Sequence, residues 1–343
     1  MFTSLAYLWG VKALPIVIAH RGASGYRPEH TRAAYELAIA MGADAVEPDL
    51  VATSDGVLVV RHENEIGGTT DVASRPEFAG RRAMKFVDGA KHTGWFTEDF
   101  TWEELSTLRA IERIPKVREA NSAWNGREGI LRFTDLLAML DSAPRPVGLV
   151  AEIKHATYFA SIGLPLDELL AAELTAAGWQ DDQRLTVESF EKSVLAKVRD
   201  RGIHARFVFL IDAKGAPADE VAANGKKARE YADFLTPDGL AVLAEEVDGI
   251  SLHKRLLLPK DAGPKSVAES TLVAEAHAAG LAVYCWTLRA ENKFLGRGLT
   301  KGPDAAAFGS WKREFTTIMR TGVDGVFADQ PDLAIQARAS LLD

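Results

Sequence analysis

Short apolar segments alternate with amphipathic segments along almost the whole chain, and this alternation limits the available folds more than any other feature. Eight of the apolar segments are rich in Val, Ile, Leu or Ala, as strands covered on both faces are. They span residues 15–20, 45–51, 147–153, 184–189, 206–211, 249–253, 281–287 and 325–328. Helical patterns between them predict a parallel sheet with helical crossovers.

The helical pattern is clearest in segment 31–41, which places its apolar residues on one stripe and is followed by Gly42, a frequent helix stop. Segments 166–177 and 267–279 repeat this pattern. Eight strand–helix units match the count of a (β/α)8 barrel, the TIM-barrel fold. The main rival is an open doubly wound sheet, which would need a strand order that one sequence does not show.

One long segment, 63–129, breaks the alternation. It contains turn residues, Trp, Arg and Gly without a clear strand–helix unit, and it is long for a loop inside a compact domain. We therefore predict an insertion subdomain within a single catalytic barrel domain covering residues 1–343. A second irregular segment, 212–229, is rich in Ala, Gly, Lys and Asp.

Charge narrows the choice of partner. The 343 residues carry a net charge of -8, and an acidic surface repels nucleic acid and anionic membranes. A small-molecule substrate is therefore expected, and the sequence makes no prediction of oligomeric state. If that substrate carries phosphate, its charge must be met by a metal or by a few placed Arg and Lys residues.

The sequence contains little information about where the protein is located in the cell. The first twenty residues lack a basic region ahead of the apolar ones, so they do not resemble a secretory signal. No apolar run approaches the ~18 residues of a membrane span. A cytoplasmic protein is expected as the sequence is written, with a periplasmic or secreted location as the alternative if it is a trimmed mature form.

Polar side chains gather at the predicted strand ends, where barrel enzymes place their catalytic groups. They are His20, Arg21, Glu47, Asp49, His62, Glu152, Lys154, Glu188, Ser189, His253, Lys254, Trp286 and Asp329.

Three of these residues are carboxylates on neighbouring strands. Glu47 and Asp49 are two positions apart, so both face one side of their strand, and Glu152 follows on the next. Hard oxygen ligands of this kind suit Mg²⁺ or Ca²⁺. The alternative is a buried ion-pair network with Arg21 and Lys154, and spacing alone does not separate the two readings.

Two histidines, His20 and His62, follow neighbouring strand segments beside these acids. Imidazole titrates nearest neutral pH, so the pair is a candidate for proton transfer. Arg21 and Lys154 suit phosphate oxygens as well as charge balance for the acids. Trp286 could form an apolar wall for a ligand or pack in the barrel core.

Residues 19–72, AHRGASGYRPEHTRAAYELAIAMGADAVEPDLVATSDGVLVVRHENEIGGTTDV, resemble the glycerophosphodiester phosphodiesterase family. The resemblance continues with AEIK, ESF, YCWT and DGVFADQPD, so it runs from about Ile16 to Asp332. Each motif alone is weak, but the combination of HRG, PEHT, E-x-D and the later His is highly specific.

This resemblance implies a (β/α)8 barrel with a small insertion after the second strand. It implies hydrolysis of glycerophosphodiesters to glycerol 3-phosphate and an alcohol such as choline or ethanolamine. The residue roles it implies are a divalent cation, Mg²⁺ or Ca²⁺, on Glu47, Asp49 and Glu152; acid–base catalysis by His20 and His62; phosphate binding by Arg21 and Lys154; and a supporting acid at Glu29. Apart from the resemblance, the strand-end position of Trp286 makes it a further candidate for substrate binding.

The sequence departs from the family pattern in three places. Glu63 follows His62 where the family commonly has Asp, which would alter the environment of that histidine. Glu188 stands where the family often has Gln, which would add a carboxylate near the site. ENEIGGTTDV is similar to the family's longer, often secreted branch, which leaves the compartment open.

Two other functions compete. The first is a lysophospholipase D-like activity on acylated glycerophosphodiesters, with an apolar groove lined by aromatic residues of segment 63–129. The preferred reading of these residues is that they form that segment's own core. They are Trp95, Phe96, Phe100 and Trp124. The second is a barrel that binds without catalysis, which is disfavoured because every matched position carries a competent residue.

Overall fold

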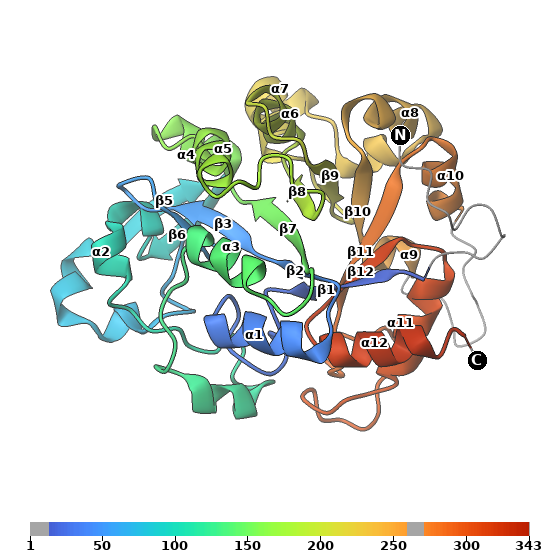
Figure 1. The fold of residues 1–343 in the computed structure, drawn as a ribbon, viewed down its shortest axis with the longest axis horizontal. Coiled ribbons are helices and arrows are strands. Elements are labelled where there is room, and N and C mark those ends of the chain that lie inside the picture. Colours follow the sequence, from blue (N-terminus) through green and yellow to red (C-terminus); the bar gives the residue numbers. More distant parts are fainter. Residues whose placement is uncertain (1–13, 259–270, 343) are drawn as a thin grey trace.

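A computed structural model describes residues 14–258 and 271–342. Its centre is a closed barrel of parallel strands surrounded by helices (Figure 1). The strands around the barrel are β1 (Ile16–His20), β2 (Ala45–Glu47) with β3 (Asp49–Ala52), β7 (Gly148–Ile153), β8 (Leu185–Ser189), β9 (Arg206–Ile211), β10 (Gly249–His253), β11 (Ala282–Leu288) and β12 (Gly325–Ala328). The ring closes because β1 pairs with both β2 and β12, and β2 pairs with β7. This confirms the predicted (β/α)8 barrel and excludes an open doubly wound sheet.

The second barrel strand is interrupted at Pro48, although the sequence predicts one strand over 45–51. Proline has no N–H to donate to a neighbouring strand, which explains the break between β2 and β3. The Pro48 carbonyl still accepts a hydrogen bond from the backbone N–H of Glu152 at 2.9 Å. Both halves pair with β7, so they occupy a single position in the barrel.

β4 (Leu58–Val60) lies outside the barrel, where it pairs antiparallel with β3. The sequence places His62 at the end of a continuation of the second strand. In the structure His62 instead follows this returning strand, which brings it back toward the barrel mouth.

A helix follows each barrel strand and covers the outside of the sheet (Figure 1). The longer helices are α1 (Arg32–Met41), α3 (Phe133–Asp141), α5 (Leu166–Ala176), α6 (Lys192–Asp200), α8 (Pro237–Glu246), α11 (Trp311–Arg320) and α12 (Pro331–Ala339). Shorter helices are α4 (Ala156–Ser161), α7 (Ala218–Asn224), α9 (Lys254–Leu257) and α10 (Leu272–Ala278). The predicted helix 267–279 is thus confirmed over α10, and its residues 267–270 lie outside the described ranges.

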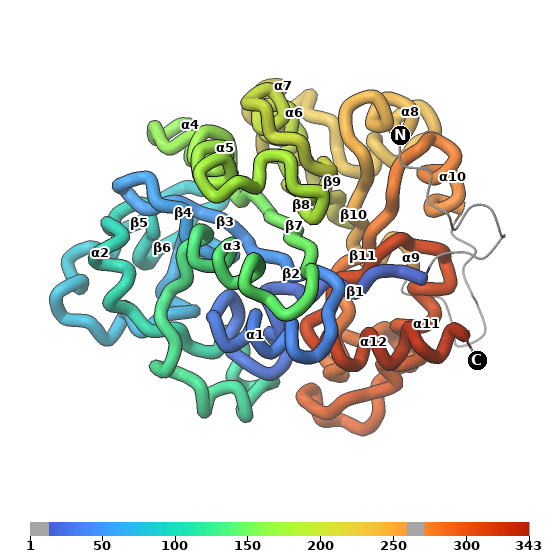
Figure 2. Tube along the Cα trace, in the orientation of Figure 1, coloured from blue at the N-terminus to red at the C-terminus, as the bar shows by residue number. Residues whose placement is uncertain are grey.

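Segment 63–129 contributes no strand to the barrel. Its elements are η2 (Asp71–Ser74), η3 (Pro76–Arg81), the hairpin β5 (Ala83–Val87) and β6 (Ala90–Gly94), η4 (Thr97–Asp99), α2 (Trp102–Leu105) and η5 (Glu119–Trp124). In Figure 2 this light-blue to blue-green part of the trace lies to one side of the barrel strands. Phe96 and Phe100 are fully buried, and Trp95 donates from Nε1 to the Phe78 carbonyl at 2.7 Å.

The barrel interior is filled by one inward-facing side chain from each of several strands, as is usual for this fold. They are Ile18, Ala45, Val150, Val208, Tyr284 and Phe327. Above this layer the strand register aligns the polar positions: His20 stands opposite Glu47, and Glu152 stands opposite both Asp49 and Glu188. The fold therefore brings the predicted polar residues to one end of the barrel.

Candidate active site

A cavity of about 990 Å³ opens at the carboxyl ends of the barrel strands. Its floor and walls include most of the residues singled out from the sequence, and further residues come from the segments after β10 and β11. The predicted residues that line it are His20, Arg21, Glu47, His62, Glu152, Lys154, Glu188, His253, Lys254 and Trp286. This is the face on which barrel enzymes build their active sites.

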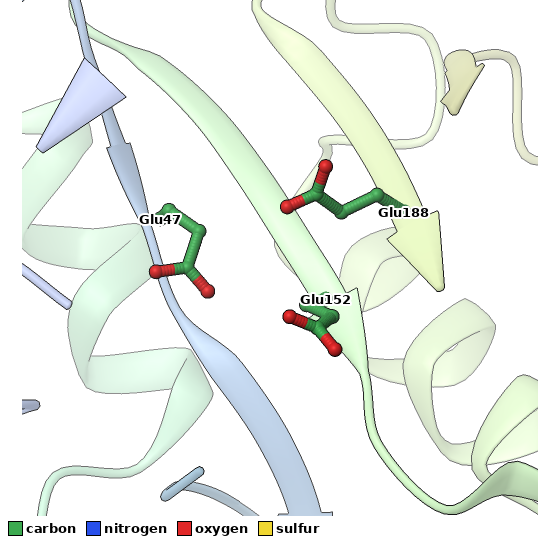
Figure 3. Close-up of side chains that lie close together, drawn as sticks. All are labelled: Glu47, Glu152 and Glu188. Carbon is green, nitrogen blue, oxygen red and sulfur yellow. The ribbon is translucent and has the colours of Figure 1, made fainter. Parts of the chain in front are cut away.

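Three carboxylates meet on the floor of this cavity. Glu47, Glu152 and Glu188 each place an oxygen within 4.8 Å of the others. Figure 3 shows their side chains reaching from three neighbouring strands into one space. All three are buried, and Glu47 Oε1 and Glu188 Oε2 have no hydrogen-bond donor.

The cluster is electrostatically unfavourable when it is fully ionised. Burial, followed by the neighbouring carboxylates, raises the pKa of Glu47 and of Glu188 well above the usual value. Burial likewise raises the pKa of Glu152 to about 8, although Lys154 opposes the shift. Buried like charges require either protons or a cation between them. The unpartnered oxygens and their hard donor character fit Mg²⁺ or Ca²⁺.

Asp49 lies beside this cluster and makes ion pairs of its own. Its Oδ2 accepts from His30 Nε2 at 2.8 Å and lies 3.2 Å from Arg21 Nε. Its Oδ1 is buried without a hydrogen-bond donor and lies 3.7 Å from Lys154 Nζ. The predicted ligand set of Glu47, Asp49 and Glu152 remains a prediction, and the geometry adds Glu188 as a fourth candidate.

The two histidines share one arrangement. His20 Nδ1 donates to Asp329 Oδ1 at 2.6 Å, and His62 Nδ1 donates to Glu63 Oε1 at 2.5 Å. A carboxylate on Nδ1 places the lone pair on Nε2. The sequence pattern identifies Asp329 only as a strand-end residue and Glu63 only as a departure from the family pattern.

Burial controls the charge of both imidazoles. Burial, followed by the charge of Arg21, lowers the pKa of His20 to about 4 even though Asp329 opposes the shift. Burial, followed by Arg21 and Lys154, lowers the pKa of His62 to about 3. Both rings are therefore neutral at neutral pH, which is the state that can accept a proton.

Arg21 is held in a tight turn directly after β1. It adopts φ 60°, and Gly22 after it adopts φ 80°; a Cβ on Gly22 would lie 2.7 Å from the Ala34 carbonyl carbon. The guanidinium lies 3.2 Å from Glu29 Oε2 and 3.2 Å from Asp49 Oδ2. Glu29, predicted as an acid near the metal, thus pairs with Arg21 and is absent from the three-carboxylate cluster.

Lys154 joins the acids to one histidine. Its Nζ donates to Glu152 Oε1 at 2.7 Å and lies 3.2 Å from His62 Nε2. Burial opposes its charge, but Glu152 and Asp49 outweigh burial and raise the pKa of Lys154. The ion-pair network and the cation-fitting carboxylates considered from the sequence therefore coexist in the structure.

Trp286 forms part of an aromatic wall. Its ring lies edge-on to Phe190, at a centroid distance of 5.4 Å, and to His253, at 4.8 Å. Its Nε1 donates to the Ser251 carbonyl at 3.1 Å, and it also packs against the barrel interior. The four aromatic residues of segment 63–129 named above are not among the residues that line the cavity within the described ranges.

A closed (β/α)8 barrel with buried carboxylates, two neutral imidazoles, Arg21 and Lys154 at the carboxyl ends of its strands has the architecture of a barrel enzyme. The model of the Glycerophosphoryl diester phosphodiesterase family matches residues 20–333, so the chain belongs to that family. This confirms the resemblance drawn from the motifs.

Individual relatives agree with that assignment. The chain is 31% identical over 328 residues to a glycerophosphodiester phosphodiesterase of Arabidopsis thaliana, covering 92% of this chain and 83% of the relative. It is 26% identical to a glycerophosphodiester phosphodiesterase of Haemophilus influenzae, covering 95% and 90% of the two chains.

Solved structures share the fold. A putative glycerophosphoryl diester phosphodiesterase from Silicibacter pomeroyi has a TM-score of 0.67 at 21% identity, covering 97% of this chain and 95% of that chain. A phosphodiesterase from Oleispira antarctica, solved in complex with the product sn-glycerol-3-phosphate, has a TM-score of 0.60 at 19% identity, covering 97% of this chain and 98% of that chain.

Within residues 14–258 and 271–342, no helix combines the length and apolar character that a membrane span needs.

Proposed function

We propose that the protein hydrolyses glycerophosphodiesters to glycerol 3-phosphate and an alcohol, with a divalent cation and with His20 and His62 as the acid–base pair. The observation that carries the proposal is the matched pair of imidazoles. Each has Nδ1 bound to a carboxylate, and both line the cavity that holds the carboxylate cluster. Hydrolysis of a diester needs a base for the nucleophile and an acid for the leaving group, and two such groups are available.

The cation would be held by Glu47, Glu152 and Glu188, with Asp49 beside them. Three buried carboxylate oxygens without a hydrogen-bond donor support this assignment: Glu47 Oε1, Asp49 Oδ1 and Glu188 Oε2. When bound, a divalent cation supplies positive charge that polarises a phosphoryl oxygen. The sequence-based choice between Mg²⁺ and Ca²⁺ stays open, because both take oxygen ligands.

The residues of the chain perform the remaining steps. Arg21 and Lys154 donate to phosphate oxygens and offset the charge that grows in the transition state. One neutral imidazole accepts a proton at Nε2 from the nucleophile, which is either water or the glycerol 2-hydroxyl. The other imidazole takes up a proton from solvent and donates it to the oxygen of the leaving alcohol as the P–O bond breaks. If the glycerol 2-hydroxyl is the nucleophile, water then opens the resulting cyclic phosphate, with the two imidazoles exchanging roles. Trp286 borders the space where the glycerol or alcohol group would lie.

The relatives support the reaction class. The Arabidopsis and Haemophilus proteins carry the name glycerophosphodiester phosphodiesterase. The Oleispira phosphodiesterase was solved with the product sn-glycerol-3-phosphate. A product that carries a phosphate is consistent with the phosphate-binding roles proposed for Arg21 and Lys154.

Substitution of the histidines tests the proposal. His20→Ala and His62→Ala should each fold and lower kcat on glycerophosphocholine by about 10²-fold or more, the usual contribution of acid–base catalysis. His204→Ala is the matched control, because the exposed His204 side chain pairs with Asp181 and is not among the residues that line the cavity. Near-normal turnover by either active-site variant would contradict its assigned role.

A lysophospholipase D-like activity is the second candidate. The size of the cavity and its apolar residues favour it, because an acyl chain needs such a lining; among them are Phe190, Leu210, Phe294, Leu295 and Leu299. Turnover on glycerophosphocholine and on lysophosphatidylcholine separates the two. A higher kcat/KM on the acylated substrate would favour the second candidate.

We also propose that segment 63–129 is an insertion subdomain of a single barrel domain. The β5–β6 hairpin supports this, because in the described ranges its strands pair only with each other.

A further inference from the structure

Two arginines of segment 63–129, five positions apart, contact the carboxylates that hold the two histidines. Arg113 contacts Glu63, the partner of His62, and Arg118 contacts Asp329, the partner of His20. Neither arginine lines the cavity. One short stretch outside the barrel therefore reaches both halves of the proposed acid–base pair.

Arg113 binds two carboxylates at once. Its NH1 and NH2 donate to Glu63 Oε1 and Oε2 at 2.9 and 2.6 Å. Its Nε and NH2 donate to Glu29 Oε2 and Oε1 at 2.7 and 2.6 Å. Paired bonds of this type fix the plane of a carboxylate as well as its position. Glu29 in turn contacts Arg21, so Arg113 also braces the phosphate-binding side of the site.

Arg118 is almost completely buried, with its side chain 7% exposed. Its NH2 donates to Asp329 Oδ2 at 2.5 Å, and its Nε donates to Glu291 Oε1 at 2.7 Å. Its NH1 donates to the Ser24 carbonyl at 3.0 Å, in the loop after β1. Asp329 Oδ1 remains available for His20 Nδ1. The guanidinium thus fixes the carboxylate oxygen that His20 does not use.

The stretch between the two arginines is itself held in shape. Backbone N–H groups of Val117 and Arg118 donate to the Ile114 carbonyl at 2.8 and 3.0 Å. Glu112 accepts from the Ile114 backbone at 2.8 Å and from Asn121 Nδ2 at 2.9 Å. A loop closed by its own hydrogen bonds presents both guanidinium groups at a fixed separation.

We infer that residues 113–118 form a strap that positions both histidines, Arg113 acting through Glu63 and Arg118 acting through Asp329. The inference rests on the proposed function, since it concerns the same reaction. Both arginines are positioning residues, because they reach the reacting atoms only through another side chain. Such partners of catalytic groups typically contribute about 10–100-fold.

A double-mutant cycle tests the strap. Arg118→Met should lower kcat on glycerophosphocholine about 10–100-fold with KM changed less than about threefold, because the histidine and not the substrate loses its support. In a His20→Ala background the same substitution should cost almost nothing further in kcat. Arg113→Met and His62→Ala form the parallel cycle. Most of the kcat loss that Arg113→Met causes in the wild type should be absent when it is introduced into the His62→Ala variant.

Arg75→Met is the matched control within segment 63–129. Arg75 pairs with Asp71 at 3.0 Å and donates to the Thr107 carbonyl at 2.8 Å, away from the cavity. The Arg75→Met variant should melt at a lower temperature than the wild type but keep the wild-type kcat. If Arg118→Met does not fold, Arg118→Lys keeps the charge and should show a partial loss of kcat that also vanishes in the His20→Ala background.

Two results would overturn the inference. One is a kcat loss for Arg118 variants that is as large with His20→Ala as without it, since Arg118 would then act independently of His20. The other is unchanged kcat in folded Arg113→Met and Arg118 variants. Failure of the proposed function is distinct from both, because it would appear as normal turnover in the single His20→Ala and His62→Ala variants.

Discussion

Asp329 holds His20 from behind: its Oδ1 accepts a hydrogen bond from His20 Nδ1 at 2.6 Å, although 309 positions separate the two residues. The contact forms because β1 and β12 are neighbours where the barrel closes. The other carboxylate oxygen of Asp329 accepts from Arg118 and Arg289. One carboxylate thus links the first and last strands to a residue of segment 63–129.

Replacing Asp329 should therefore lower kcat more than it changes KM. Asp329→Asn removes the negative charge that orients the imidazole, and kcat should fall about 10²-fold with little change in KM. Steady-state kinetics on glycerophosphocholine provide the measurement. Asp332→Asn is the control, because the Asp332 side chain accepts from the Tyr26 hydroxyl, does not line the cavity and should retain kcat. Equal kcat and KM in the two variants would contradict the role of Asp329 in orienting His20.

Glu188 should contribute to cation binding. Its Oε2 is buried without a donor beside Glu47 and Glu152, so Glu188→Gln removes one candidate ligand and part of the repulsion. At pH 9, where the cluster is more ionised than at neutral pH, we expect the variant without cation to melt at a higher temperature than the wild type. We also expect a weaker rise on adding Mg²⁺ or Ca²⁺, since a tenfold loss of affinity removes about 1.4 kcal/mol of ligand stabilisation.

Glu173→Gln is the matched control for that experiment. Glu173 is another carboxyl whose pKa is raised by burial, to about 7, but it lies away from the cavity and accepts from the Leu58 backbone. It should leave the cation-induced rise in melting temperature unchanged. If Glu188→Gln also leaves that rise unchanged, Glu188 is not a ligand.

The pKa shifts of the cluster predict how cation binding depends on pH. In the folded protein burial raises the pKa of Glu152 to about 8, so this group holds a proton at neutral pH. Burial and the neighbouring carboxylates raise the pKa of Glu47 and of Glu188 in the same direction. A raised folded-state pKa contributes stability at low pH that is lost as pH rises through about 8. The metal-free protein should therefore melt lower at pH 9 than at pH 6.

A bound cation should reverse that trend, because it needs the ionised carboxylates. Its apparent affinity should rise between pH 6 and pH 9, and binding should release protons. Calorimetry in buffers of different ionisation enthalpy measures this release. Affinity that stays constant over this range, with no proton release, would contradict the raised pKa values.

Gly22 should be needed for the geometry of Arg21. Gly22→Ala forces a Cβ to within 2.7 Å of the Ala34 backbone at φ 80°, so we expect a loss of at least about 2 kcal/mol in the free energy of unfolding and reduced turnover. Gly126→Ala is the control: its φ is 77°, but nothing lies within 4 Å of the added carbon. It should cost about 1 kcal/mol, the backbone strain alone, in denaturant unfolding.

The barrel could be predicted from the sequence because each of its strands and helices is indicated by a short, continuous stretch of residues. Each strand position could be read from a short apolar run, and α1 begins after Thr31 and ends at Gly42 as its pattern predicts. The break between β2 and β3 was missed although Pro48 signals it. The β5–β6 hairpin was missed although Asp88 and Gly89, a common hairpin turn pair, lie at its centre.

The site could be predicted only in part, because its remaining contacts depend on which distant segments meet. His20, His62 and Arg21 lie at the cavity as strand ends and motifs indicated. Arg113 and Arg118 belong to a segment without a recognisable pattern, and their partners lie up to 211 positions away. No spacing rule connects such residues, so only the folded chain identifies them.

The central claim is cation-dependent hydrolysis of a glycerophosphodiester, and release of glycerol 3-phosphate from glycerophosphocholine tests it most directly. The purified protein would be assayed with Mg²⁺, with Ca²⁺, with chelator, and with cation restored after chelation. We predict release with at least one cation, loss of release with chelator, and recovery when the cation returns. Full activity in chelator, or no release under any of these conditions, would contradict the account.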